Sequence, residues 1–296
     1  MTEPDAGARA RPATLVDGVR LALGTLSIIP VRPPGTVDRR SGGWAMTCAP
    51  LVGLLLAAAV TALLWLLGYD WFGRVPSLPE LVAGSDVLPL RAAGPMLAAT
   101  LAIALLALLT RGIHLDGLAD TADGLGSGRP APAALAIMRK SDVGPFGVAT
   151  LVLVLLTQVA ALSQHLADGR GPLAITLALV VSRLVLPVVC LRGVPAARNE
   201  GLGQVVAGSV SLPQLLLAGA ASVGLLVLAV TGLSGYSVVS ADVLVRGAAV
   251  ALVAMTAGVG LGLWCLRRLG GVTGDVLGAC VEVTFTVALV VLTLVR

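Results

Sequence analysis

The residues most suited to chemistry in this chain are three aspartates within residues 111–128, namely Asp116, Asp120 and Asp123. Their spacing of i, i+4 and i+7 places them within about 60° of one another around an α-helix. Three carboxylates on one helix face repel one another, and a divalent cation removes that conflict. Because the ligands are hard carboxylate oxygens without cysteine, the pattern favours magnesium, as one or two ions, or manganese over zinc.

Glycine is frequent in the same segment and lets the backbone approach a ligand closely. The glycines are Gly112, Gly117, Gly124, Gly126 and Gly128. An isolated acidic triplet is more often a solvated loop, but the added glycines favour a metal site. His114 points away from the acids if the helix begins before it, and folds back over them if the helix begins near Asp116. It is a candidate metal ligand, general base or, most simply, hydrogen-bonding group.

A second acidic element contains Asp275 and Glu282, which are seven residues apart and share one helix face. Glu282 would lie about 10 Å deeper along its helix than Asp275. An ionised group inside a bilayer costs roughly 2.5–3.5 kcal/mol, so it normally faces a partner or a polar cavity. Arg183 lies at a similar depth in another apolar segment. We expect Arg183 and Glu282 to pair, or to line the floor of one polar pocket, unless Arg183 snorkels to the surface.

Two further segments carry candidates for substrate binding. Arg139, Lys140 and Ser141 combine adjacent cations with a hydroxyl and nearby glycines, which suits a phosphate group. Arg198, in a second glycine-containing segment, is a weaker candidate of the same kind. Cations next to a membrane helix are also ordinary topology signals, so both interpretations stay open.

The elements that must position these residues are membrane helices. The chain has 296 residues, 57% of them hydrophobic and 12% charged, against about 25% charged in soluble domains. Its mean hydropathy is +0.96. We predict an all-α, polytopic integral membrane helical bundle with about seven transmembrane helices, within a range of six to eight. The predicted spans are 44–68, 95–111, 147–166, 172–192, 212–233, 246–266 and 276–295.

The N-terminal part is less regular. Residues 15–30 form a shorter apolar segment that ends at Pro30 and is re-entrant, interfacial or an eighth span. We expect residues 1–14 to be disordered and residues 15–296 to form a single transmembrane catalytic domain. No small-residue cleavage site follows the apolar segment, so a cleaved signal peptide is not expected.

Arginine placement predicts the orientation. Alternation of the spans puts residues 31–43, 112–146, 193–211 and 267–275 on one side, and most loop cations fall there, so that side is predicted to be cytoplasmic. These cations are Arg32, Arg39, Arg40, Arg111, Arg129, Arg139, Lys140, Arg192, Arg198, Arg267 and Arg268, whereas Arg74, Arg91, Arg170 and Arg246 fall opposite. Every segment with candidate chemistry then shares one face, where a composite site is geometrically feasible.

Other function classes are excluded by composition. The net charge is +4, but the chain has one lysine, no basic tract and 3% aromatic residues, so nucleic acid is not an expected partner. The four cysteines, Cys48, Cys190, Cys265 and Cys280, lie in or beside apolar segments without metal-type spacing. They are expected to be small hydrophobic residues rather than disulfides or ligands.

The motifs together resemble one family, the cobalamin synthases, also called adenosylcobinamide-GDP ribazoletransferases. The resemblance rests mainly on residues 114–125, His-Leu-Asp-Gly-Leu-Ala-Asp-Thr-Ala-Asp-Gly-Leu, and its supporting segments are 50–53, 137–147, 197–203 and 271–282. One departure is that Lys140 precedes Ser141 and Asp142 follows it, whereas in the family the acidic residue often comes first.

The resemblance implies a reaction and its participants. Adenosylcobinamide-GDP and alpha-ribazole, or its 5'-phosphate, would give adenosylcobalamin, or its 5'-phosphate, and GMP, with magnesium required. Asp116, Asp120 and Asp123 would hold the metal, and one of these aspartates or His114 would remove the proton. Arg139, Lys140, Ser141, Arg183, Arg198, Asp275 and Glu282 would contribute to substrate binding. The protein would lie in the inner cell membrane with its site facing the cytoplasm, with lipid and the substrates as partners and a homo-oligomer left open.

Rival functions predict different patterns. CDP-alcohol phosphotransferases use similar chemistry, but their signature has Ala-Arg where Asp120 and Thr121 stand, and its later aspartates are missing here. A transporter built around Arg183 and Glu282 would carry polar groups in both halves of the membrane. A non-enzymatic membrane scaffold would not need three carboxylates at helical spacing.

Overall fold

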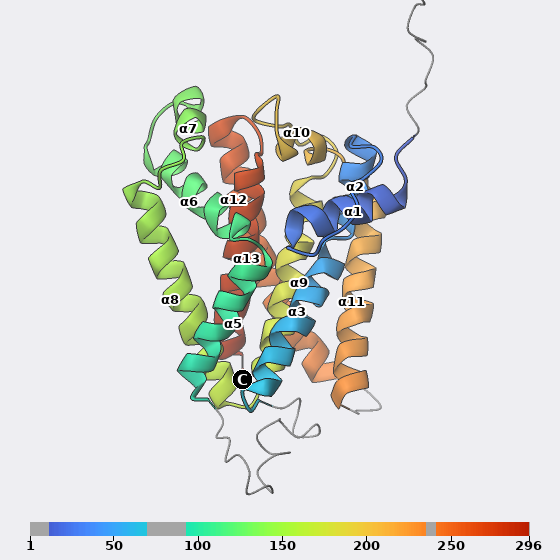
Figure 1. Ribbon diagram of the computed structural model, residues 1–296, viewed down its shortest axis with the longest axis vertical. Helices are drawn as coiled ribbons and strands as arrows, with labels where there is room; N and C mark the ends of the chain where they lie inside the picture. Colours follow the sequence, from blue (N-terminus) through green and yellow to red (C-terminus); the bar gives the residue numbers. More distant parts are fainter. Residues whose placement is uncertain (1–11, 70–92, 235–240, 296) are drawn as a thin grey trace, which may run out of the picture.

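The computed structural model describes residues 12–69, 93–234 and 241–295, and within them the chain is a bundle of α-helices without strands (Figure 1). The long helices run roughly parallel and antiparallel, and the short ones gather at one end. The elements are α1 (Leu15–Leu26), α2 (Arg39–Thr47), α3 (Ala49–Leu66), α5 (Pro95–Leu109), α6 (Ile113–Gly126), α7 (Ala131–Ile137), α8 (Pro145–Ala167), α9 (Gly171–Val189), α10 (Leu202–Val206), α11 (Leu212–Ser234), α12 (Ala241–Leu269) and α13 (Gly274–Leu294).

Six helices in the described ranges are long and apolar enough to cross a membrane, and α5 with α6 would make a seventh span if the bent pair is counted as one. The six are α3, α8, α9, α11, α12 and α13. Large apolar side chains such as Leu108, Leu153 and Leu252 are exposed on outer faces, as expected where lipid replaces water. The prediction of a polytopic helical bundle with six to eight spans is confirmed.

The first predicted span, 44–68, is wrong at its start. α2 ends at Thr47, and a new helix, α3, begins at Ala49. Pro50 in the first turn of α3 has no N–H to donate, so it suits a helix start better than a helix interior. Residues 44–47 therefore belong to a short helix at the end of the bundle.

Helix α1 is too short to span a bilayer, because 12 residues rise only about 18 Å. It lies across the bundle near one end (Figure 1). Asp17 caps it: the carboxylate accepts hydrogen bonds from Thr14 and from the backbone N–H of Gly35. These bonds lower the pKa of Asp17 from 3.8 to about 2. The expectation of disorder for residues 1–14 falls mostly outside the described residues.

The centre of the bundle is formed by α9 and α13, which are buried over most of their length. Glycines let their neighbours approach backbone to backbone. A Cβ atom built on Gly53 of α3 would lie 2.6 Å from the carbonyl oxygen of Leu179 in α9. Close packing of this kind replaces the hydrophobic effect as the source of helix association inside a membrane.

A sharp bend of 89° separates α5 from α6. It is produced by two successive residues in the left-handed region, Arg111 with φ 56° and Gly112 with φ 67°. Arg111 is the one non-glycine residue with positive φ in the described ranges, a conformation that costs roughly 1–2 kcal/mol. Its guanidinium donates a 2.8 Å hydrogen bond to the carbonyl oxygen of Gly24 in α1, which ties the bend to the N-terminal helix.

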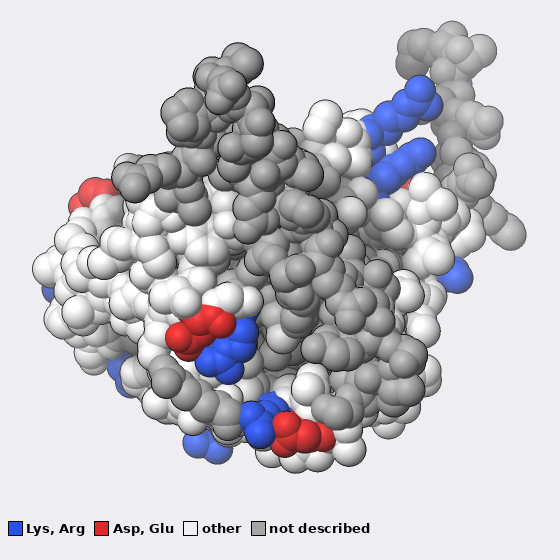
Figure 2. Space-filling view, turned by 90° about the horizontal axis from the view of Figure 1, so that it is seen from below, with Lys and Arg blue, Asp and Glu red and all other residues white. Residues whose placement is uncertain are grey.

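The two ends of the bundle carry different segments and different charged groups. The segments 31–48, 110–144, 190–211 and 270–273 all lie at one end, called here the site end, together with α2, α7 and α10 (Figure 1). The opposite, far end is seen in Figure 2, where acidic groups lie beside basic ones. Its described residues form the ion pairs of Asp168 with Arg170 and of Asp242 with Arg246. The predicted gathering of the candidate segments on one side is confirmed for the described residues, whereas Arg74 and Arg91 lie outside them.

Candidate active site at one end of the bundle

Two glycines place the aspartate helix directly against α13. A Cβ atom built on Gly117 of α6 would lie 2.6 Å from the carbonyl oxygen of Asp275, and one on Gly278 of α13 would lie 3.2 Å from the backbone of His114. Neither position has room for a larger side chain. The glycines that the sequence suggested for ligand approach are thus used, at these positions, to bring the two acidic elements together.

The result is an acidic cluster of three carboxylates, Asp116 and Asp120 on α6 and Asp275 on α13. All three interact electrostatically with one another. Asp116 is exposed, whereas Asp120 and Asp275 are partly buried. The nearest compensating cation is Arg198, whose guanidinium donates a 3.1 Å hydrogen bond to the carboxylate of Asp275. Three acids against one base leave this cluster negatively charged.

Asp123 has partners other than those the sequence predicts. Its two carboxylate oxygens accept hydrogen bonds from the backbone N–H groups of Gly144 and Gly147, at 2.7 and 2.9 Å. The side chain is buried, with 7% of its surface exposed. It therefore fastens the start of α8 to α6. It is less exposed than Asp116 and Asp120, although its charge still acts on Asp120.

The carboxylates of the acidic cluster fit a magnesium ion whose shell is completed by substrate phosphates. Among the described residues no three His, Cys, Asp or Glu side chains form a ready-made cation cage. Magnesium in proteins is usually bound by one or two carboxylates, with substrate phosphates completing its shell. The excess negative charge of Asp116, Asp120 and Asp275 over Arg198 suits such binding, because a divalent cation would offset the repulsion among the three acids.

His114 lies on the helix face opposite the acids. α6 begins at Ile113, so the first of the two sequence alternatives holds and His114 points away from Asp116. The imidazole is buried and neither ring nitrogen has a hydrogen-bond partner among the described residues. No described protein group supplies the expected hydrogen bond, so that expectation stays a prediction, and the place of His114 within the bundle separates it from the acidic cluster.

Arg183 and Glu282 are both buried inside the bundle, and they interact electrostatically with each other without a direct ion pair. Glu282 instead accepts a 2.8 Å hydrogen bond from the side-chain amide of Gln158 in α8. Arg183 donates to the hydroxyl of Ser182, while two of its guanidinium nitrogens have no partner in the described structure. The snorkelling alternative for Arg183 is wrong, because its side chain is fully buried.

The cationic candidates occupy the rim of the site end. Arg139 pairs with Glu200 at 2.6 Å, which joins the segment after α7 to the segment before α10, and both side chains are largely exposed. Lys140 and Ser141 are exposed beside Arg139. Arg198 is held more firmly, because in addition to Asp275 it donates a 2.9 Å hydrogen bond to the carbonyl oxygen of Leu135. Three segments far apart in the sequence are thereby joined around the acids.

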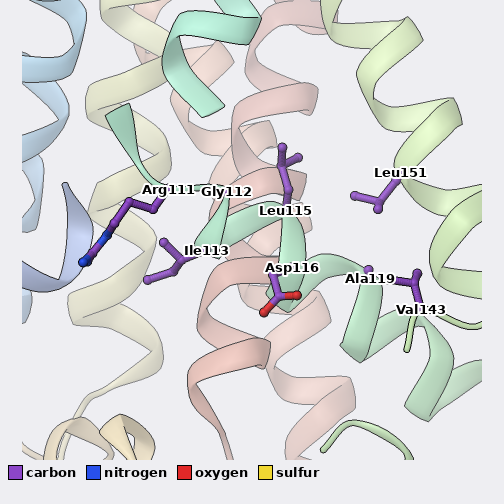
Figure 3. Close-up of a pocket in the computed structure, with 8 residues that line it drawn as sticks. All are labelled: Arg111, Gly112, Ile113, Leu115, Asp116, Ala119, Val143 and Leu151. Carbon is purple, nitrogen blue, oxygen red and sulfur yellow. The ribbon is translucent and has the colours of Figure 1, made fainter. Parts of the chain in front are cut away.

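A cavity of about 510 Å³ opens beside Asp116 (Figure 3). Asp116 is the only carboxylate that lines it within the described residues, and the remaining walls are mainly apolar. Residues of α6 form one side, with Val143 and Leu151 across the cavity (Figure 3). A large amphiphilic ligand could place apolar surface here while a phosphate group reaches Asp116.

Sequence reasoning missed Gln158, Thr273 and Glu200. Gln158 is an amide within an apolar helix, a signal as visible as the charge of Glu282 to which it binds. Thr273 caps α13 and donates to the carboxylate of Asp275. Glu200 has no such signal, because a single acid in a polar loop is ordinary.

Comparison with known proteins gives a consistent result. A family model described as cobalamin-5-phosphate synthase matches residues 18–293. The adenosylcobinamide-GDP ribazoletransferase of Frankia casuarinae is 38% identical over 288 residues, covering 92% of this chain and 93% of the relative. The protein of the same name from Nocardioides sp. is also 38% identical, covering 92% of this chain and 96% of the relative. The one from Klebsiella pneumoniae (strain 342) is 38% identical as well, covering 79% of this chain and 80% of the relative. No solved structure matches. The chain therefore belongs to the cobalamin-5-phosphate synthase family.

Proposed function

We propose that this chain is an adenosylcobinamide-GDP ribazoletransferase of cobalamin biosynthesis. It would join adenosylcobinamide-GDP to alpha-ribazole or its 5'-phosphate and release GMP, in the inner cell membrane and with its site facing the cytoplasm. The names of relatives that cover nearly the whole chain support the reaction class. The observation that carries the assignment to a site is the acidic cluster of Asp116, Asp120 and Asp275, of which Asp116 lines a cavity.

The reaction is a displacement at phosphorus. A ribose hydroxyl oxygen forms a bond to the phosphorus that carries the cobinamide, the bond from that phosphorus to the oxygen of the GMP phosphate breaks, and the hydroxyl proton is released. Bound magnesium would supply positive charge for the diphosphate and for the departing phosphate. Asp116 and Asp120 would hold it.

The remaining residues of the site would position these groups. Arg198 would fix the carboxylate of Asp275, because it joins this carboxylate to the carbonyl oxygen of Leu135 in α7. Asp123 fixes the start of α8, which contributes Leu151 to the cavity. Arg139, Lys140 and Ser141 lie on the exposed rim, where a cation and a hydroxyl could contact the nucleotide phosphate. Arg183 and Glu282 would support the bundle beneath the cluster.

The test is GMP release by the purified full-length protein in lipid nanodiscs, measured with both substrates and with or without magnesium. Asp116→Asn and Asp120→Asn should each lower kcat by at least about a hundredfold, as is common when a charged group that acts on the transferring phosphoryl group is removed. Both variants should unfold at nearly the wild-type temperature, because exposed or partly exposed acids contribute little to packing.

Asp242→Asn serves as the matched control, because it removes one carboxylate from an exposed ion pair at the far end of the bundle. Its activity should equal that of the wild type. Wild-type turnover that is unchanged when magnesium is chelated would refute the metal assignment, and an active Asp120→Asn variant would refute the site.

A further inference from the structure

A second cavity, larger than the first, lies at the site end and contains none of the acids described above. Its volume is about 1090 Å³, at the upper end of the range for small-molecule sites. It is an open cavity bordered by α2, the segments on either side of α10, and the start of α11, which lie together in Figure 1. We call it the arginine cavity, because its lining includes Arg39, Arg40 and Arg192.

The arginine cavity carries a strong positive charge. No aspartate or glutamate is among its lining residues, and none of its three arginines forms an ion pair within the described part of the chain. Arg39 is held in place by a 2.7 Å hydrogen bond to the carbonyl oxygen of Ala207. The guanidinium groups of Arg40 and Arg192 have no partner among the described residues, so their donors are available to a ligand. Planar guanidinium groups are suited to bidentate contacts with phosphate.

The frame around the arginine cavity is closely packed. Cβ atoms built on Gly42 and Gly43 of α2 would lie 2.7 and 2.6 Å from the carbonyl oxygens of Val205 and Ser209. Helix α2 is therefore seated directly on the segment that includes α10, which fixes the backbone that carries Arg39 and Arg40. Membrane topology accounts for arginines at this end of the bundle, but not for their convergence on one cavity.

One wall of the arginine cavity is apolar and aromatic. Trp44 is partly buried there, with Pro195 and Leu217 as further lining residues. An indole ring offers a stacking surface to a flat heterocycle. Phosphate donors and a stacking surface in one cavity match a molecule that has a phosphate group and an aromatic base.

The two cavities share a connecting segment. Pro195 lines the arginine cavity, and Arg198, three residues later, contacts Asp275 of the acidic cluster. Three residues span at most about 10 Å, so the lining of the arginine cavity lies close to the residue that binds Asp275.

We propose that the arginine cavity is a second ligand site, which binds the phosphate monoester of an aromatic nucleoside. The inference rests on the proposed function, in which two molecules have this chemistry: alpha-ribazole 5'-phosphate as the acceptor and GMP as the product. Phosphate contacts come from Arg40 and Arg192, with Arg39 as a fixed neighbour. Trp44 contacts the base.

The experiment measures binding of three compounds by titration calorimetry to the full chain in neutral phosphatidylcholine nanodiscs. The compounds are alpha-ribazole 5'-phosphate, GMP and unphosphorylated alpha-ribazole. In Arg40→Ala and Arg192→Ala, the Kd of one phosphorylated compound should rise by about tenfold or more, as expected for loss of a charge-assisted hydrogen bond. The Kd of alpha-ribazole should stay unchanged, and Trp44→Leu should weaken binding of the compound whose base it contacts.

Arg267→Ala is the matched control, because Arg267 is an exposed cation of the last turn of α12 that does not line the cavity. It should leave every Kd unchanged. If the arginine variants lose affinity only for alpha-ribazole 5'-phosphate, the cavity binds the acceptor. If they lose affinity only for GMP, the cavity binds the product. The inference would be overturned if each phosphorylated compound bound to Arg40→Ala and to Arg192→Ala with the same Kd as to the wild type.

Two further measurements complete the test. The first shows whether the arginine cavity binds a lipid or a nucleotide, and the second tests the proposed function independently of the cavity. If anionic phosphatidylglycerol in the nanodiscs abolishes nucleotide binding, and the arginine variants remove that effect, the cavity holds a lipid headgroup and the inference is wrong. Turnover by the wild type with alpha-ribazole or its 5'-phosphate tests the proposed function separately. Its absence with both acceptors refutes that function, whereas normal turnover with unaltered nucleotide binding in the variants refutes only the arginine cavity.

Discussion

The carboxylate of Asp123 performs the capping that α8 cannot provide for itself. Gly144 stands at the N-cap of α8 and has no side chain to bind the free N–H groups of the first turn. Asp123, from α6, accepts two of these bonds and places its negative charge at the positive end of the helix dipole. A single acid thus couples the orientation of the aspartate helix to that of the helix across the cavity.

Replacing Asp123 by asparagine should therefore affect stability more than metal affinity. An amide keeps one carbonyl acceptor and loses the other, so we expect a cost of about 1–3 kcal/mol in unfolding free energy. Thermal unfolding in detergent would show a lower midpoint, while the magnesium concentration for half-maximal residual activity would remain as in the wild type.

The control is Asp142→Asn, a change of the same type at an exposed position next to α8. It should leave the unfolding midpoint unchanged. If Asp123→Asn unfolds like the wild type and needs far more magnesium, Asp123 is a metal ligand and its structural assignment is wrong.

At the scale of elements, the decisive contact is the packing of α6 on α13. Gly117 permits it, because the carbonyl oxygen of Asp275 occupies the space that a Cβ atom would need. The obstacle is backbone rather than the tip of a flexible side chain, so a methyl group can be accommodated only by moving a helix. Moving α6 away from α13 would also separate Asp116 and Asp120 from Asp275.

Gly117→Ala should therefore destabilise the protein by about 1–3 kcal/mol and lower GMP release more than about tenfold. The measurements are thermal unfolding and turnover at saturating substrate. Gly260→Ala in α12 is the matched control, since nothing lies within 4 Å of its built Cβ atom. The control should be neutral or slightly stabilising, because alanine is the better helix former. Full activity in Gly117→Ala would show that the close approach of the two helices is not required.

At the scale of the whole molecule, the bundle has two unlike ends. The acidic cluster, both cavities and the short helices share the site end, while the described ion pairs of the far end are local ones between neighbours in sequence. Both substrates and the released nucleotide would therefore meet the protein from one side of the membrane.

The predicted orientation can be tested by cysteine labelling. The native cysteines are buried or partly buried, so a variant without them can carry a single new thiol at Arg129, in the α6–α7 connection, or at Asp242, at the start of α12. A membrane-impermeant maleimide should label Arg129→Cys in inside-out vesicles and Asp242→Cys in right-side-out vesicles. The reverse pattern would place the site on the outer side.

The sequence predicted the membrane helices well, because a long apolar run has few other solutions in a bilayer. It also identified the clustering of the acidic segments, since alternation of spans sets the side of every loop. It could not determine the face of His114, which depends on whether the helix begins one residue before His114 or two residues after it. Nor could it separate Asp123 from Asp116, because helical spacing says nothing of the backbone N–H groups that another helix brings close.

The arginine cavity was likewise beyond sequence reasoning. Arg39, Arg40 and Arg192 were recognised only as topology signals, since their convergence depends on α2 packing against the segment around α10. Similarly, Arg198 looked like a weak phosphate ligand, and only the folded chain shows it bound to Asp275 and to the carbonyl group of Leu135.

The bend at Arg111 and Gly112 determines how deep Asp116 lies. The 15 residues of α5 rise about 22 Å, which is less than the hydrocarbon thickness of about 30 Å. A helix that begins at one membrane surface and turns after that length would stop short of the other surface, and Asp116 follows the turn by only a few residues. Its carboxylate would then lie below the membrane surface, so a hydrated ion or a phosphate would have to descend to it through the cavity lined by α6 and Leu151.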